Sequence, residues 1–171
     1  MPLVAETGGQ NAMVVDSSAL PEQVVADALS SAFDSAGQRC SALRVLFVQE
    51  DIAARVLAML AGAMAELSVG DPARLETDVG PIIDAAAKAG LEAHIAKLEK
   101  SGQLVARAPA APGAHGHFVS PVAFEIGSLA ELEREVFGPV LHVVRFRGPD
   151  LAQVVDAINA AIHDIPPEKV R

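Results

Sequence analysis

The sequence predicts an α/β fold in three layers, with an open, mostly parallel sheet covered by helices on both faces. Apolar strand-like runs alternate with amphipathic helical segments, which is the order expected for parallel strands joined by crossover helices. Two of the runs, residues 43–48 and 140–146, are almost continuously apolar, as is typical of strands covered on both faces. The chain has 171 residues, 51% of them hydrophobic, which is enough for one domain with a core of its own.

The elements follow from local patterns. The predicted strands are residues 3–5, 13–15, 43–48, 104–106, 118–126 and 140–146. The predicted helices are residues 21–33, 52–67, 84–100, 129–134 and a last one through 154–158. Pro21 suits the first turn of the first helix, and Asp51 is a plausible cap for the second. Pro121 cannot donate a ladder hydrogen bond, so its strand is expected at an edge or a bulge.

Composition excludes several classes of protein. The net charge of −9 would repel a phosphate backbone, so this segment is not expected to bind nucleic acid. The single cysteine rules out an internal disulfide and a multi-cysteine zinc site, and fits a reducing compartment. The N-terminus lacks a secretory pattern, and the most apolar window, residues 56–65, is too short to span a bilayer. We therefore expect a cytoplasmic protein without a membrane span.

The histidines do not suggest a metal site. His115 and His117 lie in a loop rich in Ala, Pro and Gly, and no thiol or carboxylate lies near them in sequence. No metal ligand set is therefore predicted. His142 lies within an apolar strand and is expected to be a hydrogen-bonded core histidine or one that faces outward.

Cys40 is the residue around which a site is expected. It lies between a predicted helix and a predicted buried strand, with Arg39 and Arg44 beside it and Gly37 to allow a tight turn. A thiol attacks as its thiolate, and cationic neighbours favour that form. The alternative is a small buried hydrophobe, because that is how most free cysteines occur.

Three blocks carry a resemblance to a known family. They are Glu-Thr-Gly-Gly-Gln-Asn at 6–11, Gly-Gln-Arg-Cys-Ser-Ala at 37–42 and Glu-Val-Phe-Gly-Pro-Val-Leu at 135–141. Together and in this order they resemble the catalytic domain of the aldehyde dehydrogenase superfamily. They are most similar to glutamate-semialdehyde (1-pyrroline-5-carboxylate) dehydrogenase, and residues 12–25 resemble the version fused into bacterial bifunctional proline utilisation proteins.

The resemblance implies a role for each residue. Cys40 would be the nucleophile, with its own backbone N–H as one oxyanion donor, and Glu6 would be the general base. Glu135 would bind the nicotinamide ribose, Phe137 would lie beside the nicotinamide, and Ser41 would contact the substrate. The implied reaction is the NAD-dependent oxidation of L-glutamate γ-semialdehyde to glutamate in proline catabolism, through a cysteine thiohemiacetal and a thioester.

The resemblance also sets the expected domain organisation. Residues 1–160 would be a partial aldehyde dehydrogenase catalytic domain, and residues 161–171 a divergent polar tail. No Gly-x-Gly-x-x-Gly follows a strand, so the sequence offers no dinucleotide fingerprint, and the resemblance implies that NAD would be bound mainly by a domain outside this chain. The isolated chain is therefore expected to be inactive, and the parent enzyme, which binds a small aldehyde, is a possible homo-oligomer.

Other interpretations stay open. Glu6 could instead be a solvated acid in a turn, and Glu135 could be one more charge on a helix already rich in charges. Phe137 could be a core residue rather than a cofactor contact. The chain could belong to another aldehyde dehydrogenase of the superfamily. It could instead be a non-catalytic interaction fragment, because exposed sheet edges favour pairing. A thiol hydrolase is a remoter alternative, since no histidine lies near Cys40 in sequence.

Overall fold

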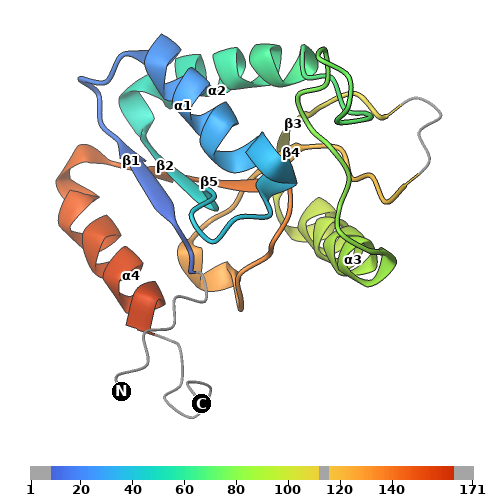
Figure 1. Ribbon diagram of the computed structural model, residues 1–171. Coiled ribbons are helices and arrows are strands. Elements are labelled where there is room, and N and C mark those ends of the chain that lie inside the picture. The colour runs from blue at the N-terminus through green and yellow to red at the C-terminus, as the bar shows by residue number, and fades with distance from the viewer. Residues whose placement is uncertain (1–8, 112–115, 164–171) are drawn as a thin grey trace, which may run out of the picture.

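The computed structural model describes residues 9–111 and 116–163, which form one five-stranded sheet with helices on both faces (Figure 1). The strands are β1 (Ala12–Val15), β2 (Val45–Gln49), β3 (Gln103–Arg107), β4 (Val122–Glu125) and β5 (Val140–Phe146). The α-helices are α1 (Pro21–Phe33), α2 (Glu50–Ala65), α3 (Ala85–Ser101) and α4 (Leu151–His163). Short 3₁₀ turns form η1 (Asp34–Gly37), η2 (Leu129–Glu131) and η3 (Gly148–Asp150).

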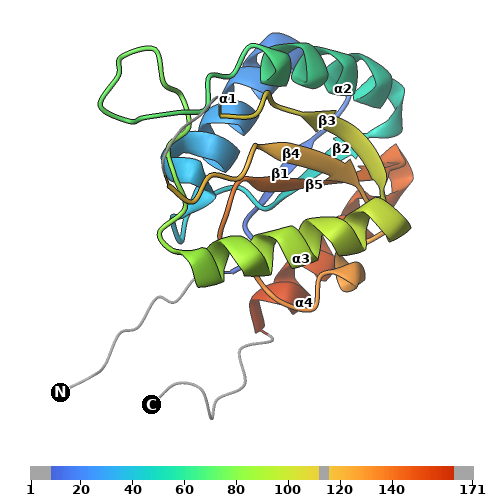
Figure 2. The same ribbon diagram turned by 90° about the vertical axis from the view of Figure 1, so that its right-hand side faces the viewer.

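The layers match the predicted fold class. Helices α1 and α2 cover one face of the sheet, and α3 and α4 lie on the opposite face (Figure 2). The strand order is β1-β2-β5-β4-β3, in which β1, β2, β5 and β4 are parallel and β3 runs antiparallel to β4. The prediction of a mostly parallel, open, three-layer sheet is therefore confirmed.

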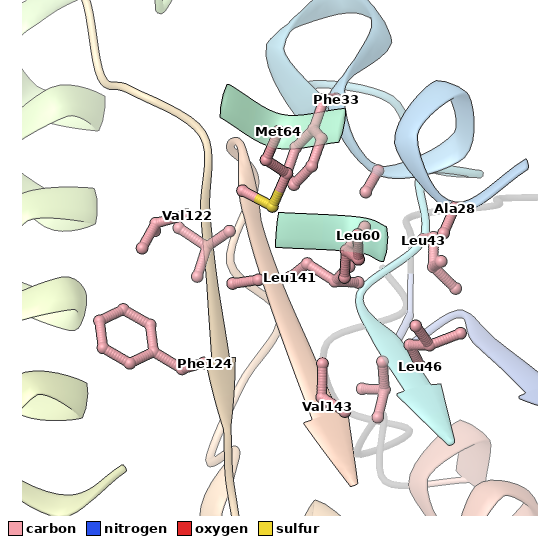
Figure 3. Packing of buried hydrophobic residues seen from close by; sticks show 14 of the residues in the cluster. Ala28, Phe33, Leu43, Leu46, Leu60, Met64, Val122, Phe124, Leu141 and Val143 are labelled. Carbon is pink, nitrogen blue, oxygen red and sulfur yellow. The ribbon is translucent and has the colours of Figure 1, made fainter. Parts of the chain in front are cut away.

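The core explains why the central strands are so apolar. Strands β2 and β5 pair in the middle of the sheet, so their side chains meet helices on both sides. Leu46 and Leu141 are fully buried on the side of α1 and α2, where Leu60 of α2 meets them, whereas Phe124 points toward α3 (Figure 3). Both predicted continuous runs are therefore central strands.

The predicted edge position of the Pro121 strand is wrong, and the register shift of the β3–β4 ladder lies in β3, between Leu104 and Ala106, rather than at Pro121. Strand β4 begins at Val122, directly after the proline, and it is an interior strand between β5 and β3. Because Pro121 precedes the ladder, its missing N–H costs no inter-strand hydrogen bond. Its carbonyl oxygen instead accepts a hydrogen bond from the backbone N–H of Ala108 at 2.8 Å.

Two predicted helix starts and ends also differ. Helix α2 begins at Glu50 with Gln49 in the N-cap position, so Asp51 lies inside the first turn rather than at the cap. The predicted helix over 129–134 is only the single turn η2, which Ser128 and Glu131 close with a reciprocal capping box. A turn this short leaves Glu135 in an irregular segment before β5.

Some expectations fall on other parts of the chain. The predicted strand 3–5 and His115 lie outside the described residues. Helix α4 runs to residue 163, so the expected boundary after residue 160 falls within this helix. Within 9–111 and 116–163, no helix is long and apolar enough to cross a membrane.

Two histidines form a polar contact inside the apolar interior. His142 of β5 is only 1% exposed, and its Nδ1 lies 2.9 Å from the Arg44 carbonyl oxygen. A carbonyl oxygen only accepts, so Nδ1 must carry the hydrogen and Nε2 must be the acceptor. His142 Nε2 lies 2.9 Å from Nε2 of His94 on α3, which therefore donates. The expectation of a hydrogen-bonded core histidine is confirmed.

Burial of this pair makes the fold sensitive to acid. Burial lowers the pKa of His142 to about 4, and the positive charges of His94 and Arg44 act in the same direction. Burial also lowers the pKa of His94, with Lys97 and Arg134 contributing. In the unfolded chain a histidine takes up its proton near its ordinary pKa, so below that pH the unfolded state binds a proton that folded His142 does not.

We expect the free energy of unfolding to fall by about 2 kcal/mol between pH 7.5 and pH 5 because of His142. Urea unfolding of the chain and of His142→Asn across this range measures the effect. Asn keeps a donor for the Arg44 carbonyl and does not titrate, so the variant should be less stable at pH 7.5 but show a flatter pH dependence. An unchanged slope in the variant would contradict the assignment.

Candidate active site

Cys40 lies in an exposed turn between η1 and β2. Three consecutive residues before it adopt left-handed backbone angles, with φ of 56° at Ser35, 53° at Ala36 and 65° at Gly37. Such a run is rare for residues with a Cβ and persists only where surrounding contacts hold it. The exposed sulfur shows that the alternative prediction of a buried core cysteine is wrong.

Gly37 brings the turn that carries Cys40 (residues 37–42, here called the thiol turn) against the segment before β5. A Cβ built on Gly37 would lie 2.2 Å from the backbone oxygen of Gly138, closer than any side chain tolerates. A Cβ on Gly138 would in turn lie 2.3 Å from Leu91 of α3. Gly37 is therefore needed for the second and third sequence blocks to pack together, and Gly138 for the third block to pack against α3.

Asn11 binds the thiol turn from the side of β1. Its Nδ2 donates to the carbonyl oxygens of Cys40 and Ala42, the latter at 3.0 Å. The backbone carbonyl oxygen of Asn11 accepts hydrogen bonds from the backbone N–H groups of Arg44 and Val45, at 2.9 and 3.1 Å. One asparagine thus fixes the carbonyl groups of both neighbours of Ser41.

Gln38 holds the same turn from the other side. Its side-chain amide donates to the carbonyl oxygen of Pro81 at 3.1 Å and accepts from the backbone N–H of Ile83 at 2.9 Å. These two bonds fasten the segment that leads into α3 to the residue two positions before Cys40. The turn therefore has polar anchors on two sides.

Arg44 is the most deeply buried charged residue of the described chain, with 0% exposure. Its Nη1 donates to the Gly37 carbonyl oxygen at 2.6 Å, and its Nη2 donates to that of Arg39 at 3.0 Å. Burial lowers the pKa of the Arg44 guanidinium, while the Glu135 carboxylate and the Cys40 thiolate favour its charged form. The cation is therefore surrounded by acceptors.

Glu135 links the third sequence block directly to the first and, through Arg44, to the second. Its Oε1 accepts from Arg44 Nε at 3.1 Å across 91 residues of sequence, and its Oε2 accepts from the backbone N–H of Gly9 at 2.8 Å. The Glu135 side chain is 14% exposed, so it lies at the rim of this interior ion pair. The interpretation of Glu135 as one more charge on an acidic helix is wrong.

Phe137 closes the site above the guanidinium. The ring centroid lies 4.9 Å from the Arg44 Cζ, an attractive cation–π arrangement, and the ring is 42% exposed. Phe137 is therefore not a core residue, and part of its surface remains available to a ligand.

The remaining predicted site residues have different outcomes. Ser41 is exposed and directly follows Cys40 in the turn. Glu6 lies outside the described residues, and the nearest described member of its block is Gly9, which contacts Glu135. Arg39 is exposed and donates to the Ser30 carbonyl oxygen at 3.2 Å, in the last turn of α1.

Two residues of this site had no such role in the sequence-based prediction. Asn11 was not among the predicted site residues, and Arg44 was expected only to supply positive charge near the thiol. The available signal was the position of Arg44 between Leu43 and Val45 at the start of an apolar strand, because an arginine there must find anionic or carbonyl partners.

The site lies at the amino ends of parallel strands. Asn11 directly precedes β1, the thiol turn precedes β2, and Glu135 to Gly138 precede β5. Because these three strands are parallel and adjacent, their entry segments meet at one edge of the sheet. Among the described residues no group of three His, Cys, Asp or Glu side chains gathers as a metal site requires.

We expect Gly37→Ala to lower the free energy of unfolding by about 2 kcal/mol or more, because the new Cβ meets backbone atoms and the φ is left-handed. Urea unfolding measures the change. Gly62→Ala is the matched control, since nothing lies within 4 Å of its Cβ position inside α2 and alanine favours a helix. Equal effects of the two substitutions would contradict the close approach.

Comparison with known proteins identifies the family. The profile of the aldehyde dehydrogenase family matches residues 1–162. The bifunctional protein PutA of Salmonella typhimurium is 57% identical over 94% of this chain and 13% of its own length, and that of Escherichia coli K12 is 55% identical over the same shares. The chain is also 34% identical to 1-pyrroline-5-carboxylate dehydrogenase of Geobacillus kaustophilus, over 88% of this chain and 29% of that protein.

Solved structures agree with this. A crystal structure of a mutant of Bradyrhizobium japonicum proline utilization A (PutA) superposes with a TM-score of 0.89 at 54% identity, and covers 94% of this chain and 16% of that one. The chain thus spans less than a fifth of the length of the PutA proteins it matches. Since the family profile covers residues 1–162 of the sequence, the chain belongs to the aldehyde dehydrogenase family.

Proposed function

We propose that this chain supplies the thiol and part of the cofactor contact of an enzyme that oxidises L-glutamate γ-semialdehyde to glutamate in proline catabolism. The observation that carries the proposal is the convergence of the exposed Cys40 turn and the Glu135–Phe137 segment on one buried arginine. The similarity to PutA and to 1-pyrroline-5-carboxylate dehydrogenase supports this substrate over other aldehydes.

In the proposed reaction the Cys40 thiolate adds to the aldehyde carbon, and the carbonyl electron pair moves to oxygen. The backbone N–H of Cys40 donates to that oxyanion. Loss of hydride from the same carbon leaves a thioester on Cys40. Glu6 then removes a proton from water, the hydroxide adds to the thioester carbon, and the sulfur leaves again as thiolate. Aldehyde, water and oxidised cofactor thus give acid, reduced cofactor and protons.

The hydride acceptor of aldehyde dehydrogenases is a nicotinamide dinucleotide, and we propose NAD here. Glu135 and Phe137 fit such a ligand. The Glu135 carboxylate is partly exposed, and it accepts from Arg44 and Gly9 without filling all of its acceptor sites, so a ribose hydroxyl could still donate to it. The exposed part of the Phe137 ring is suited to stacking against a flat heterocycle.

Substrate choice would involve Ser41, which stands exposed beside the nucleophile. A serine hydroxyl can donate to the carboxylate end or to the carbonyl of a small polar aldehyde. The remaining contacts to the dinucleotide and the substrate would come from parts of the enzyme other than this chain.

The test places the chain in full-length Escherichia coli PutA in exchange for the segment it matches, and follows NAD reduction with glutamate semialdehyde. We expect turnover, and we expect Cys40→Ala in the same protein to reduce it by at least about 10³-fold. Arg55→Lys, in an exposed ion pair with Glu22, is the matched control and should keep full turnover.

The pure 171-residue chain, assayed in parallel, should reduce NAD no faster than background. A folded exchange protein that binds NAD but does not oxidise the semialdehyde would contradict the proposed function. Faster turnover of betaine aldehyde than of the semialdehyde would make betaine aldehyde the better candidate substrate. Betaine aldehyde is tested because the chain is 37% identical to betaine aldehyde dehydrogenase 2 of Rhizobium meliloti.

A further inference from the structure

We propose that Arg44 is a positioning residue that couples the Glu135 carboxylate to the Cys40 turn, so that a ligand engaging Glu135 alters the placement of the thiol. This inference deepens the proposed function, because it concerns the same nucleophile and the same cofactor contact. It rests on the contacts of one buried side chain.

The donors of Arg44 divide between the two partners. Nη1 and Nη2 hold the carbonyl oxygens of Gly37 and Arg39, at 2.6 and 3.0 Å, and these peptide groups lie immediately before Cys40. Nε and Nη2 face Oε1 of Glu135, each at 3.1 Å. Among the described residues, only the Arg44 side chain hydrogen-bonds both to carbonyl oxygens of the thiol turn and to a side chain of the segment before β5.

The guanidinium transmits displacement because it is rigid. Its donors are fixed in one plane, so a shift of the carboxylate on one side must move or break the bonds to the carbonyls on the other. A flexible ammonium group would absorb the same shift. Phe137 covers the face of the guanidinium at 4.9 Å and limits movement out of the plane.

The main chain of Arg44 cannot absorb the shift either. Its N–H donates to the Asn11 carbonyl oxygen at 2.9 Å, and its carbonyl oxygen accepts from both the backbone N–H and Nδ1 of His142. Arg44 is thereby bonded to the entry of β1 and to β5 at once. A displacement of its side chain therefore passes to the thiol turn, whose strained backbone depends on those bonds.

Burial makes the coupling energetically significant. A guanidinium without solvent contact depends on its protein partners for charge compensation. The anionic partner of Arg44 is the Glu135 carboxylate. When a ribose hydroxyl donates a hydrogen bond to the same carboxylate, the bond between Glu135 and Arg44 weakens or reorients. The Cys40 turn then responds before any aldehyde arrives.

The test is a double-mutant cycle on the rate of Cys40 alkylation by iodoacetamide in the full 171-residue chain. Cys40 is the only cysteine, so uptake of one carbamidomethyl group reports this residue alone. The variants are Glu135→Gln, Arg44→Met and the two combined, each checked for folding by circular dichroism. Alkylation needs neither aldehyde nor dinucleotide, so its failure is distinguishable from failure of the proposed function.

We expect Glu135→Gln and Arg44→Met each to slow alkylation by about fivefold or more, and the double variant to react like Arg44→Met alone. Arg44→Lys keeps the charge but loses the planar fork, so it should also abolish the effect of Glu135→Gln. If Arg44→Met does not fold, the cycle with Arg44→Lys decides. Glu22→Gln and Arg55→Met, in an exposed ion pair, form the matched control cycle and should change the rate by less than about twofold.

Three results would overturn the proposal. One is a rate within about twofold of the unaltered chain for Glu135→Gln. Another is an equal effect of Glu135→Gln with and without Arg44, which would show that Glu135 acts on Cys40 independently of Arg44. The third is the same slowing in Leu60→Ala, a core variant remote from the turn, which would indicate general loosening of the fold.

Discussion

The ion pair between Arg44 and Glu135 is the constraint on which the rest of the site depends. A guanidinium with no solvent contact loses its hydration, so every donor must find a protein acceptor. In this chain the acceptors are one carboxylate and two backbone carbonyls of the thiol turn. Among the described residues, no buried side-chain nitrogen or oxygen lacks a hydrogen-bond partner. The positions of the turn and of Glu135 thus follow from satisfying one cation.

The same cation accounts for the strained backbone before Cys40. Left-handed angles at Ser35 and Ala36 cost free energy, because their Cβ atoms crowd the following carbonyl groups. That cost is offset by the bonds that Arg44 and Asn11 make to the turn, by the bond that Gln38 makes from the turn to Pro81, and by the close packing of Gly37 on Gly138. Strain supported in this way beside an exposed cysteine is typical of functional turns.

The sequence was sufficient for the parts governed by local pattern. Continuous apolar runs identified β2 and β5 as central strands, and the glycine beside Cys40 indicated a tight turn. It was insufficient where tertiary contacts decide. Pro121 lies directly before an interior strand. Whether the proline lies in the strand or before it depends on the residue at which inter-strand pairing begins, and tertiary contacts set that residue. The bond between Arg44 and Glu135 spans 91 residues, and the His94–His142 contact joins α3 to β5, so no local spacing could reveal either.

The position of the site explains why its central residue is an arginine. In open α/β sheets ligands usually bind at the carboxyl ends of the strands, where helix N-termini offer positive partial charge. Here the entry segments of β1, β2 and β5 meet at the amino ends, and α1 arrives with its C-terminus, which carries negative partial charge. The carboxylate at this edge, and a cysteine whose reactive form is the thiolate, need a cation that the helix cannot supply. Arg44 supplies it from within the sheet, while Arg39 binds a carbonyl of the last turn of α1.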